Sequence, residues 1–286
     1  MNERRTLAIG TRGSALALAQ ARWVGEWLEA RGRATRVEVI RTRGDVPPDE
    51  PLPAEGVGLF TSALQEALGS GRVDLVVHSL KDLPLLPSPG LTLAAVPVRA
   101  DPRDAWVGRP PGRLVRVGTS SPRRRALLGA LYPEVTPVPL RGNLDTRLGR
   151  VQSGAVDAVV VAQAGLSRLG HKSAALMLLD PDRFVPAPAQ GALGVEVRTE
   201  DDDARLAVAD LDDETTRRCA LAERSVLAGL GGGCQLPMGA HARAAGEGYV
   251  LTAFHAPAGL TPRWARREGK DPAELAALVT AALGGR

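Results

Sequence analysis

Short apolar runs alternate with amphipathic stretches along most of the chain, and their order predicts an α/β protein. Residues 6–10 and 73–77 are typical of buried strands, and apolar positions recur at helical spacing between Leu16 and Leu28. Polar turns separate these segments, and Ser14 is placed to cap the first helix. Strand–turn–helix units joined by buried strands favour a parallel or mixed sheet covered by helices.

Three short segments recur in the same order further along the chain. The matching pairs are 10–14 with 118–121, 43–45 with 141–143, and 71–77 with 154–160. Each match alone is weak, but together they indicate an internal duplication and hence two similar α/β domains. Ligands of such sheets bind outside the carboxyl ends of the strands, near helix N-termini. We therefore expect a ligand cleft between two facing domains.

The chain is expected to cross between these domains near residues 99–103 and 185–190. The remainder reads as a small α+β domain, with a helix over 213–230 and a last helix capped by Asp271. Its strand-like segments are 239–244, 248–255 and 263–268. The predicted division is 1–98 with 190–211 (domain 1), 99–189 (domain 2) and 212–286 (domain 3).

Composition narrows the class of protein. The 286 residues are 44% hydrophobic and 24% charged, which is enough apolar material to build cores and excludes global disorder. Two cysteines do not form a disulfide framework or a zinc cluster, so no metal is expected. The N-terminus leads directly into a strand without a signal-peptide pattern, and no apolar run is long enough to span a membrane. A cytoplasmic enzyme or binding protein is expected.

The basic residues point to an anionic ligand. The formal net charge is +4, and only three of the 36 basic residues are lysines. Arginine suits bidentate carboxylate or phosphate binding, although a GC-rich genome or heat adaptation accounts for most of these arginines. The exceptions follow predicted strand ends or begin predicted helices: Arg12, Arg123, Arg124, Arg141, Arg147 and Arg168. Nucleic acid is a weaker fit, because aromatic residues make up only 3% of the chain.

Two further positions could carry chemistry. Cys234 follows three glycines, which leaves its thiol unshielded and suits covalent attachment or nucleophilic attack, or else it is an incidental cysteine. Cys219 lies at an apolar helix position and is expected in the core. Lys81 and Asp82 directly follow a buried strand, where a carboxylate could stabilise a cation or move a proton. Spacing alone favours a helix cap or a salt bridge for Asp82.

The chain resembles the porphobilinogen deaminase family through a set of motifs that run in the family's order from residue 8 to residue 237. The motifs are 8–12 with Ser14, 42–45, 78–84, 101–105, 118–124, 140–143 with 146–148, 164–170, 190–192 and 232–237. As a set they are highly specific. The resemblance implies two periplasmic-binding-protein-like α/β domains around a cleft, plus a small α+β C-terminal domain.

The resemblance also implies the activity. Members of the family are transferases that join four porphobilinogen molecules head to tail and release ammonia at each step. The product is hydroxymethylbilane, an intermediate of tetrapyrrole biosynthesis. A dipyrromethane cofactor, held by a thioether to the loop cysteine, serves as primer, and Cys234 matches that cysteine. Each substrate loses ammonia to give an azafulvene, which the last pyrrole of the chain attacks. Asp82 matches the catalytic aspartate, which stabilises cationic pyrrole states.

The remaining site residues follow from the same resemblance. Every pyrrole carries an acetate and a propionate, so a growing chain needs many basic partners. The implied cofactor-binding residues are Lys81, Asp82, Ser121, Arg123, Arg124, Arg141, Arg147 and Cys234. The implied substrate-binding residues are Arg12, Ser14, Phe60, Arg147, Arg168 and Gln190. The family's loop before Phe60 usually carries lysines, whereas residues 54–58 here have none.

The resemblance implies a monomer, and the composition predicts that it binds neither nucleic acid nor a membrane. The competing reading is a non-catalytic anion-binding protein of the same two-domain architecture. Anion binding alone does not require a third domain with an exposed Gly-Gly-Cys loop. The presence of this domain therefore favours the enzyme.

Overall fold

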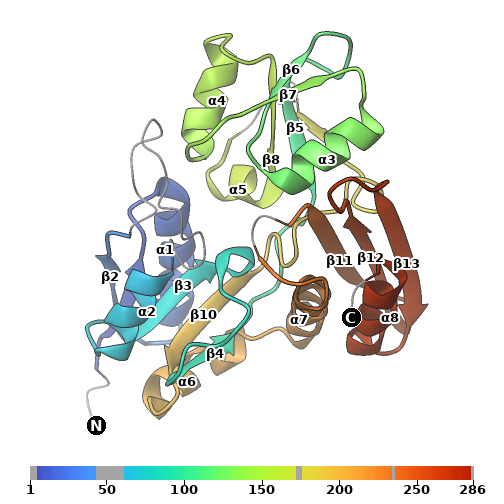
Figure 1. Cartoon of the computed structure of the whole chain (residues 1–286). Coiled ribbons are helices and arrows are strands. Elements are labelled where there is room, and N and C mark those ends of the chain that lie inside the picture. The colour runs from blue at the N-terminus through green and yellow to red at the C-terminus, as the bar shows by residue number, and fades with distance from the viewer. Residues whose placement is uncertain (1–4, 43–60, 172–175, 234–235, 285–286) are drawn as a thin grey trace. The chain divides into compact units, whose positions relative to one another are not determined.

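The computed structural model describes residues 5–42, 61–171, 176–233 and 236–284. The chain divides into two compact units (Figure 1). Unit 1 comprises Met1–Arg99 and Ala192–Arg217, and unit 2 comprises Ala100–Gly191 and Arg218–Arg286. The two expected crossings adjoin these boundaries. Unit 2 joins most of the segments that the sequence assigns to domains 2 and 3. None of the helices in the described ranges is long and apolar enough to cross a membrane.

Unit 1 contains a five-stranded mixed sheet with the order β2-β1-β3-β10-β4. Its strands are β1 (Leu7–Thr11), β2 (Thr35–Val39), β3 (Leu75–Ser79), β4 (Leu91–Ala95) and β10 (Leu193–Arg198). β1 runs parallel to β2 and β3, and β10 is antiparallel to β3 and β4. Its helices are α1 (Ala15–Glu29), α2 (Ser62–Gly69), α6 (Asp202–Val208) and the 3₁₀ turns η1 (Leu80–Asp82) and η2 (Ala209–Leu211).

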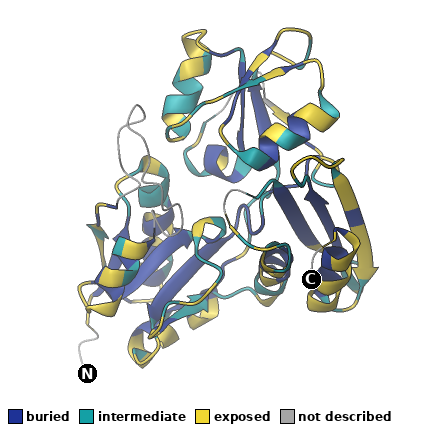
Figure 2. Ribbon diagram, viewed as in Figure 1, coloured by how far each residue is buried: buried dark blue, intermediate teal, exposed yellow. Residues whose placement is uncertain are grey.

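Alternation along β1 sends side chains to both faces of this sheet. Leu7 and Ile9 pack with α1 and α6 on one face, whereas Ala8 packs with α2 on the other. Because both faces are covered at the centre of the sheet, β1 and β3 are largely apolar rather than alternating. Figure 2 shows this burial concentrated on the strands. The predicted strands and the Ser14 cap of α1 are confirmed.

Unit 2 contains a second five-stranded sheet with the order β7-β6-β8-β5-β9. Its strands are β5 (Asp104–Gly108), β6 (Arg116–Gly118), β7 (Thr136–Val138), β8 (Ala158–Ala162) and β9 (Leu176–Leu178), with α3 (Pro122–Leu131), α4 (Leu144–Gln152) and α5 (Gln163–Arg168). β6 is parallel to β7 and β8, and β5 is antiparallel to β8 and β9. The first sheet has the same arrangement, so the predicted pair of similar α/β domains is confirmed.

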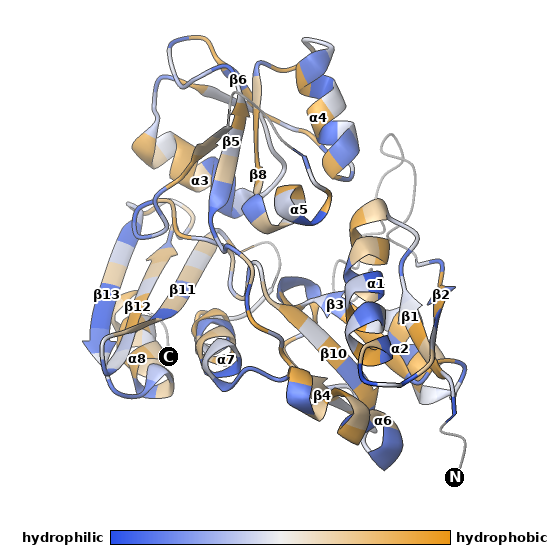
Figure 3. Cartoon of the chain, turned by 180° about the vertical axis from the view of Figure 1, so that it is seen from behind, coloured by the Kyte–Doolittle hydropathy of each residue, from blue (hydrophilic) through white to orange (hydrophobic). Residues whose placement is uncertain are grey.

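Unit 2 also contains a three-stranded antiparallel sheet, β11 (Met238–Ala245), β12 (Gly248–His255) and β13 (Arg263–Gly269). α8 (Pro272–Ala282) and the part of α7 (Glu214–Gly229) that follows Arg217 supply the apolar residues that cover one face, Cys219 among them. The outer strand β13 is largely hydrophilic (Figure 3), as suits an edge strand. The small α+β region, the Asp271 cap of α8 and the core position of Cys219 are confirmed.

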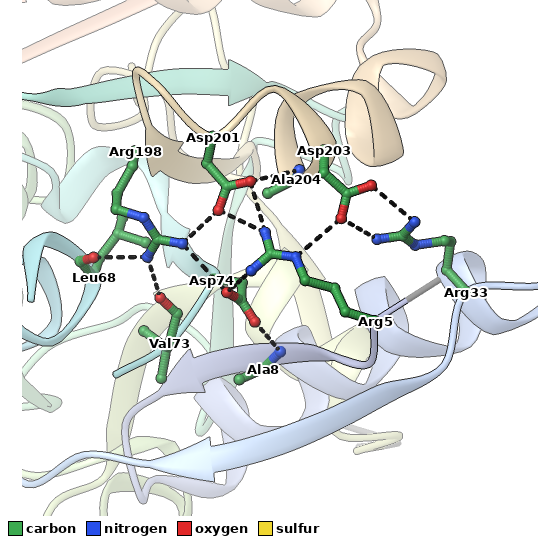
Figure 4. A network of polar contacts seen from close by, with 10 residues as sticks. All are labelled: Arg5, Ala8, Arg33, Leu68, Val73, Asp74, Arg198, Asp201, Asp203 and Ala204. Atoms are coloured by element: carbon green, nitrogen blue, oxygen red, sulfur yellow. Dashed lines mark hydrogen bonds and ion pairs between the residues drawn. The ribbon is translucent and has the colours of Figure 1, made fainter. Parts of the chain in front are cut away.

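A network of three arginines and three aspartates lies at one end of the first sheet (Figure 4). Arg5 contacts Asp74 at 2.7 Å and Asp201 at 2.6 Å, and Arg198 bonds both of these carboxylates. Arg33 extends the network by bonding Asp203 at 2.7 Å. The network therefore joins the start of β1, the start of β3, the end of β10 and the first turn of α6.

Candidate active site

In unit 1, the turn between β1 and α1 carries two predicted substrate residues. Thr11 is buried, and its hydroxyl donates to the Ala17 carbonyl at 3.0 Å, which fixes the turn. The Ser14 side chain accepts a hydrogen bond from the Ala17 N–H at 3.3 Å and caps α1. Arg12, between them in the turn, is partly exposed. This arrangement places a hydroxyl and a guanidinium beside a helix N-terminus, where anions are favoured.

Asp82 ends the 3₁₀ turn that follows β3. Its side chain is exposed, and its carboxylate has no hydrogen-bond or ion-pair partner within the described ranges. The helix-cap or salt-bridge role that spacing alone favoured therefore finds no support among those residues. Lys81, beside it, is partly buried and has a partner. At the end of β3, Ser79 accepts a hydrogen bond from Gln20 at 3.0 Å, so the strand is anchored to α1 immediately before the turn.

In unit 2, the turn between β6 and α3 repeats the arrangement seen after β1. Ser121 caps α3 by accepting a hydrogen bond from the Arg124 N–H at 3.4 Å, with Pro122 at the first helical position. This cap places Arg123 and Arg124 in the first turn. Both arginines are buried, with exposed fractions of 4% and 6%.

One buried carboxylate holds both of these arginines. Asp104, fully buried at the start of β5, accepts from Arg123 Nη1 at 2.7 Å and from Arg124 Nη2 at 2.7 Å. Burial alone would raise the pKa of Asp104, but the charges of Arg123 and Arg124 outweigh burial and hold the pKa below its ordinary value. Arg123 Nη1 also donates to the Val185 carbonyl at 2.7 Å.

Two further arginines of unit 2 have no carboxylate partner within the described residues. Arg147 donates through Nε to the Gly142 carbonyl at 2.9 Å, and Arg168 donates through Nη2 to the Gly191 carbonyl at 2.7 Å. Burial lowers the pKa of Arg147 to about 10, and the charge of Arg124 adds to this effect. Burial likewise lowers the pKa of Arg168 to about 10. Each cation is thus desolvated, and none of the described residues supplies a carboxylate to compensate its charge.

The remaining predicted site residues differ in burial, and some lie outside the described ranges. Arg141 is exposed just before α4, whereas Gln190 is fully buried. Gln190 donates through Nε2 to the Pro102 carbonyl at 2.9 Å and to Asp104 at 3.0 Å. Phe60, Cys234 and the loop over 54–58 lie outside the described residues. Within the described ranges, no group of His, Cys, Asp or Glu side chains could hold a metal ion.

Sequence reasoning assigned no role to Asp104, which the structure places at the centre of the arginine cluster. A signal was available, because Asp104 directly precedes the apolar run Ala105–Val107. A charged residue at the start of a buried strand needs a partner. The pattern does not say which of the many arginines provides it.

Comparisons with known proteins find similar chains over most of the sequence. A family model described as "Porphobilinogen deaminase, dipyromethane cofactor binding domain" matches residues 7–206, and the model of the C-terminal domain matches residues 217–278. A porphobilinogen deaminase of Nocardia farcinica is 52% identical over 242 residues, covering 82% of this chain and 69% of that protein. One of a Roseiflexus species is 49% identical over 257 residues, covering 87% and 85%.

Among solved structures, the periplasmic aliphatic sulphonate binding protein SsuA of Escherichia coli is similar at 15% identity and a TM-score of 0.41. The likeness covers 78% of this chain and 69% of that one.

Proposed function

The chain belongs to the porphobilinogen deaminase family, and we propose which of its residues carry out the family's transfer reaction. The protein is a transferase of tetrapyrrole biosynthesis with a dipyrromethane cofactor. It condenses four porphobilinogen molecules into hydroxymethylbilane and releases ammonia at each step.

The observation that carries the assignment of residues is the excess of buried positive charge in unit 2. The charge of Arg124 acts on both Arg123 and Arg147. Within the described residues, Asp104 pairs with Arg123 and Arg124, and Arg147 has no carboxylate partner. Buried cations without counter-charges are unfavourable, so the site is suited to an anionic ligand. The cofactor and substrate carry an acetate and a propionate on each pyrrole ring. The residues present therefore fit dipyrromethane.

In this proposal Ser121, Arg123, Arg124, Arg141 and Arg147 bind carboxylates of the cofactor, with Lys81 assisting. Cys234 holds the cofactor through a thioether. When bound, the cofactor supplies the pyrrole carbon that attacks the activated substrate. Arg12, Ser14, Arg147 and Arg168 bind the carboxylates of incoming porphobilinogen, and Phe60 completes the substrate residues.

Asp82 is the proposed catalytic group. An exposed carboxylate can accept a hydrogen bond from a pyrrole N–H. Its negative charge then stabilises the positive charge that develops on the pyrrole as ammonia leaves. Because the Asp82 carboxylate makes no hydrogen bond or ion pair within the described residues, it is available for this role without breaking such an interaction.

The proposed attachment is tested by the intact mass of the denatured chain. We expect an excess equal to two joined pyrrole units, localised to the Cys234 peptide, and no such excess in Cys234→Ser. A bare mass is followed by incubation with porphobilinogen and a second measurement. Apoenzyme gains pyrrole mass, whereas a non-catalytic anion-binding protein does not. A full excess in Cys234→Ser would refute the attachment site.

The proposal also covers the location, the oligomeric state and the domain organisation of the protein. We propose a cytoplasmic monomer that binds no nucleic acid and is organised as the three domains defined from the sequence. Light scattering across a hundredfold range of protein concentration tests the monomer, and a mass that rises with concentration would refute it.

A further inference from the structure

Asp104 collects three side chains from separate parts of unit 2. Its Oδ2 accepts from Arg123, and its Oδ1 accepts from Arg124 and from Gln190 Nε2 at 3.0 Å. A second bond from Arg124, through Nε at 3.2 Å, completes a two-point contact with the same oxygen. Two donors that converge on one oxygen fix the edge of the guanidinium that faces Asp104.

Gln190 has no side-chain N–H left for a substrate carboxylate. The amide nitrogen has two hydrogens, and its two partners are the Pro102 carbonyl at 2.9 Å and Asp104. A carboxylate ligand can only accept hydrogen bonds, so Gln190 cannot hold one without first breaking a contact inside unit 2. The side chain is also fully buried. Its contacts therefore connect it to the arginines rather than to the substrate's carboxylates.

The backbone around Gln190 is held in place from both sides. Ala189 has a positive φ of 60°, and its N–H donates to Glu223 Oε2 at 2.6 Å. Gly191 has φ 90°, and a Cβ there would lie 2.5 Å from the Ala100 carbonyl oxygen. An unfavourable backbone conformation persists only where its surroundings impose it. Gln190 is thus presented to Asp104 by a constrained segment.

These contacts leave one part of Arg124 available. Nε and Nη2 are engaged by Asp104, whereas Nη1 has no hydrogen-bond partner within the described ranges. We infer that Asp104 and Gln190 are positioning residues that orient Arg124 for the carboxylates of the bound pyrrole chain. Gln190 acts through Asp104, and Asp104 acts through its two-point contact with Arg124. The inference rests on the proposed role of Arg124 as a cofactor ligand.

The test measures how fast the chain acquires its cofactor. Full-length protein produced without porphobilinogen is mixed with limiting porphobilinogen, and the gain of pyrrole mass is followed by mass spectrometry. We expect Gln190→Met to slow this gain by about tenfold, and Arg124→Met to slow it further. The double variant should be no slower than Arg124→Met, because a positioning residue has no effect once its target is gone.

Controls separate this role from a loss of stability. Gln152→Met makes the same change at an exposed position on α4, and we expect it to load like the wild type. Thermal melts identify variants that do not fold; if Gln190→Met is among them, Asp104→Asn replaces it, with the same expected slowing and non-additivity.

Two results would overturn the inference: unchanged loading in Gln190→Met, or a double variant slowed by the product of the two single effects. Absence of any pyrrole mass in the wild type would instead overturn the proposed function.

Discussion

Asp74 and Asp157 make the same backbone contact at equivalent points of the two α/β sheets. The Asp74 Oδ2 accepts from the Ala8 N–H at 2.8 Å, and the Asp157 Oδ2 accepts from the Arg116 N–H at 2.8 Å. Each aspartate also donates its own N–H to the carbonyl of the same partner, at 2.8 and 3.0 Å. Each precedes a central strand, β3 or β8, and joins it to the neighbouring parallel strand. The internal duplication thus extends to individual hydrogen bonds.

The two aspartates nevertheless differ in burial, and we predict different effects of removing them. Ala8 is 2% exposed, so Asp74→Ala leaves a buried N–H without a partner and breaks the contacts to Arg5 and Arg198. Loss of the buried hydrogen bond alone corresponds to about 2 kcal/mol of unfolding free energy. Arg116 is exposed, so water can replace Asp157.

Thermal melts followed by circular dichroism should show a clear loss of Tm in Asp74→Ala and little change in Asp157→Ala. Equal losses in the two variants would contradict this explanation.

The two repeated aspartates belong to the part of the fold that the sequence predicted. Both lie within the matching segments 71–77 and 154–160, and the shared order of buried strands and capped helices predicted the two sheets. The role of Asp104 could not be predicted in this way, because its partners lie between 19 and 86 positions away in the sequence. These partners are Arg123, Arg124 and Gln190. No local periodicity reports such contacts. The buried state of Gln190 also required the structure, since its motif carried no sign that both amide hydrogens are engaged.

Replacing the Asp82 carboxylate should impair chemistry and spare the fold. Asp82→Asn keeps the shape of the side chain and removes its charge, and no hydrogen bond or ion pair within the described residues is lost. We expect porphobilinogen consumption to fall by about a hundredfold or more, with an unchanged melting curve. Asp210→Asn is the matched control, because Asp210 is an exposed aspartate in the other 3₁₀ turn of unit 1. Activity of Asp82→Asn within twofold of the wild type would rule out a catalytic role.

Arg147 should be a functional residue that does not stabilise the free protein. Burial lowers its pKa to about 10, which means that the folded protein holds this charge less favourably than water does. Arg147→Met keeps the aliphatic stem, so we expect an unchanged or higher Tm, by about 2–4 °C for each kcal/mol gained. Uptake of porphobilinogen should fall at least tenfold.

Arg150→Met, in the last turn of the same helix and exposed, should leave Tm and uptake unchanged. Normal uptake in Arg147→Met would exclude the proposed contact with substrate and cofactor.

The network of Figure 4 should make unit 1 sensitive to acid. The hydrogen bond from Arg33 lowers the pKa of Asp203; burial opposes this effect, and Arg5 reinforces it. Because the folded pKa lies below the unfolded one, this contribution to stability is complete above about pH 5 and is lost as the pH falls through the folded pKa. Asp203→Asn should therefore have a lower Tm at pH 7 and a shallower fall in Tm below about pH 4.

Asp202→Asn tests whether the effect belongs to the network or to acidic residues in general. Asp202 lies beside Asp203 in the first turn of α6, and its own pair with Arg205 is exposed at the surface. Exposed pairs contribute little, so this variant should follow the wild-type curve at every pH. The difference between the two asparagine variants separates the contacts of Asp203 with Arg33 and Arg5 from the effects of the other titrating carboxylates. If both variants lose Tm in parallel with the wild type down to pH 3, the Arg33–Asp203 pair does not contribute to acid sensitivity.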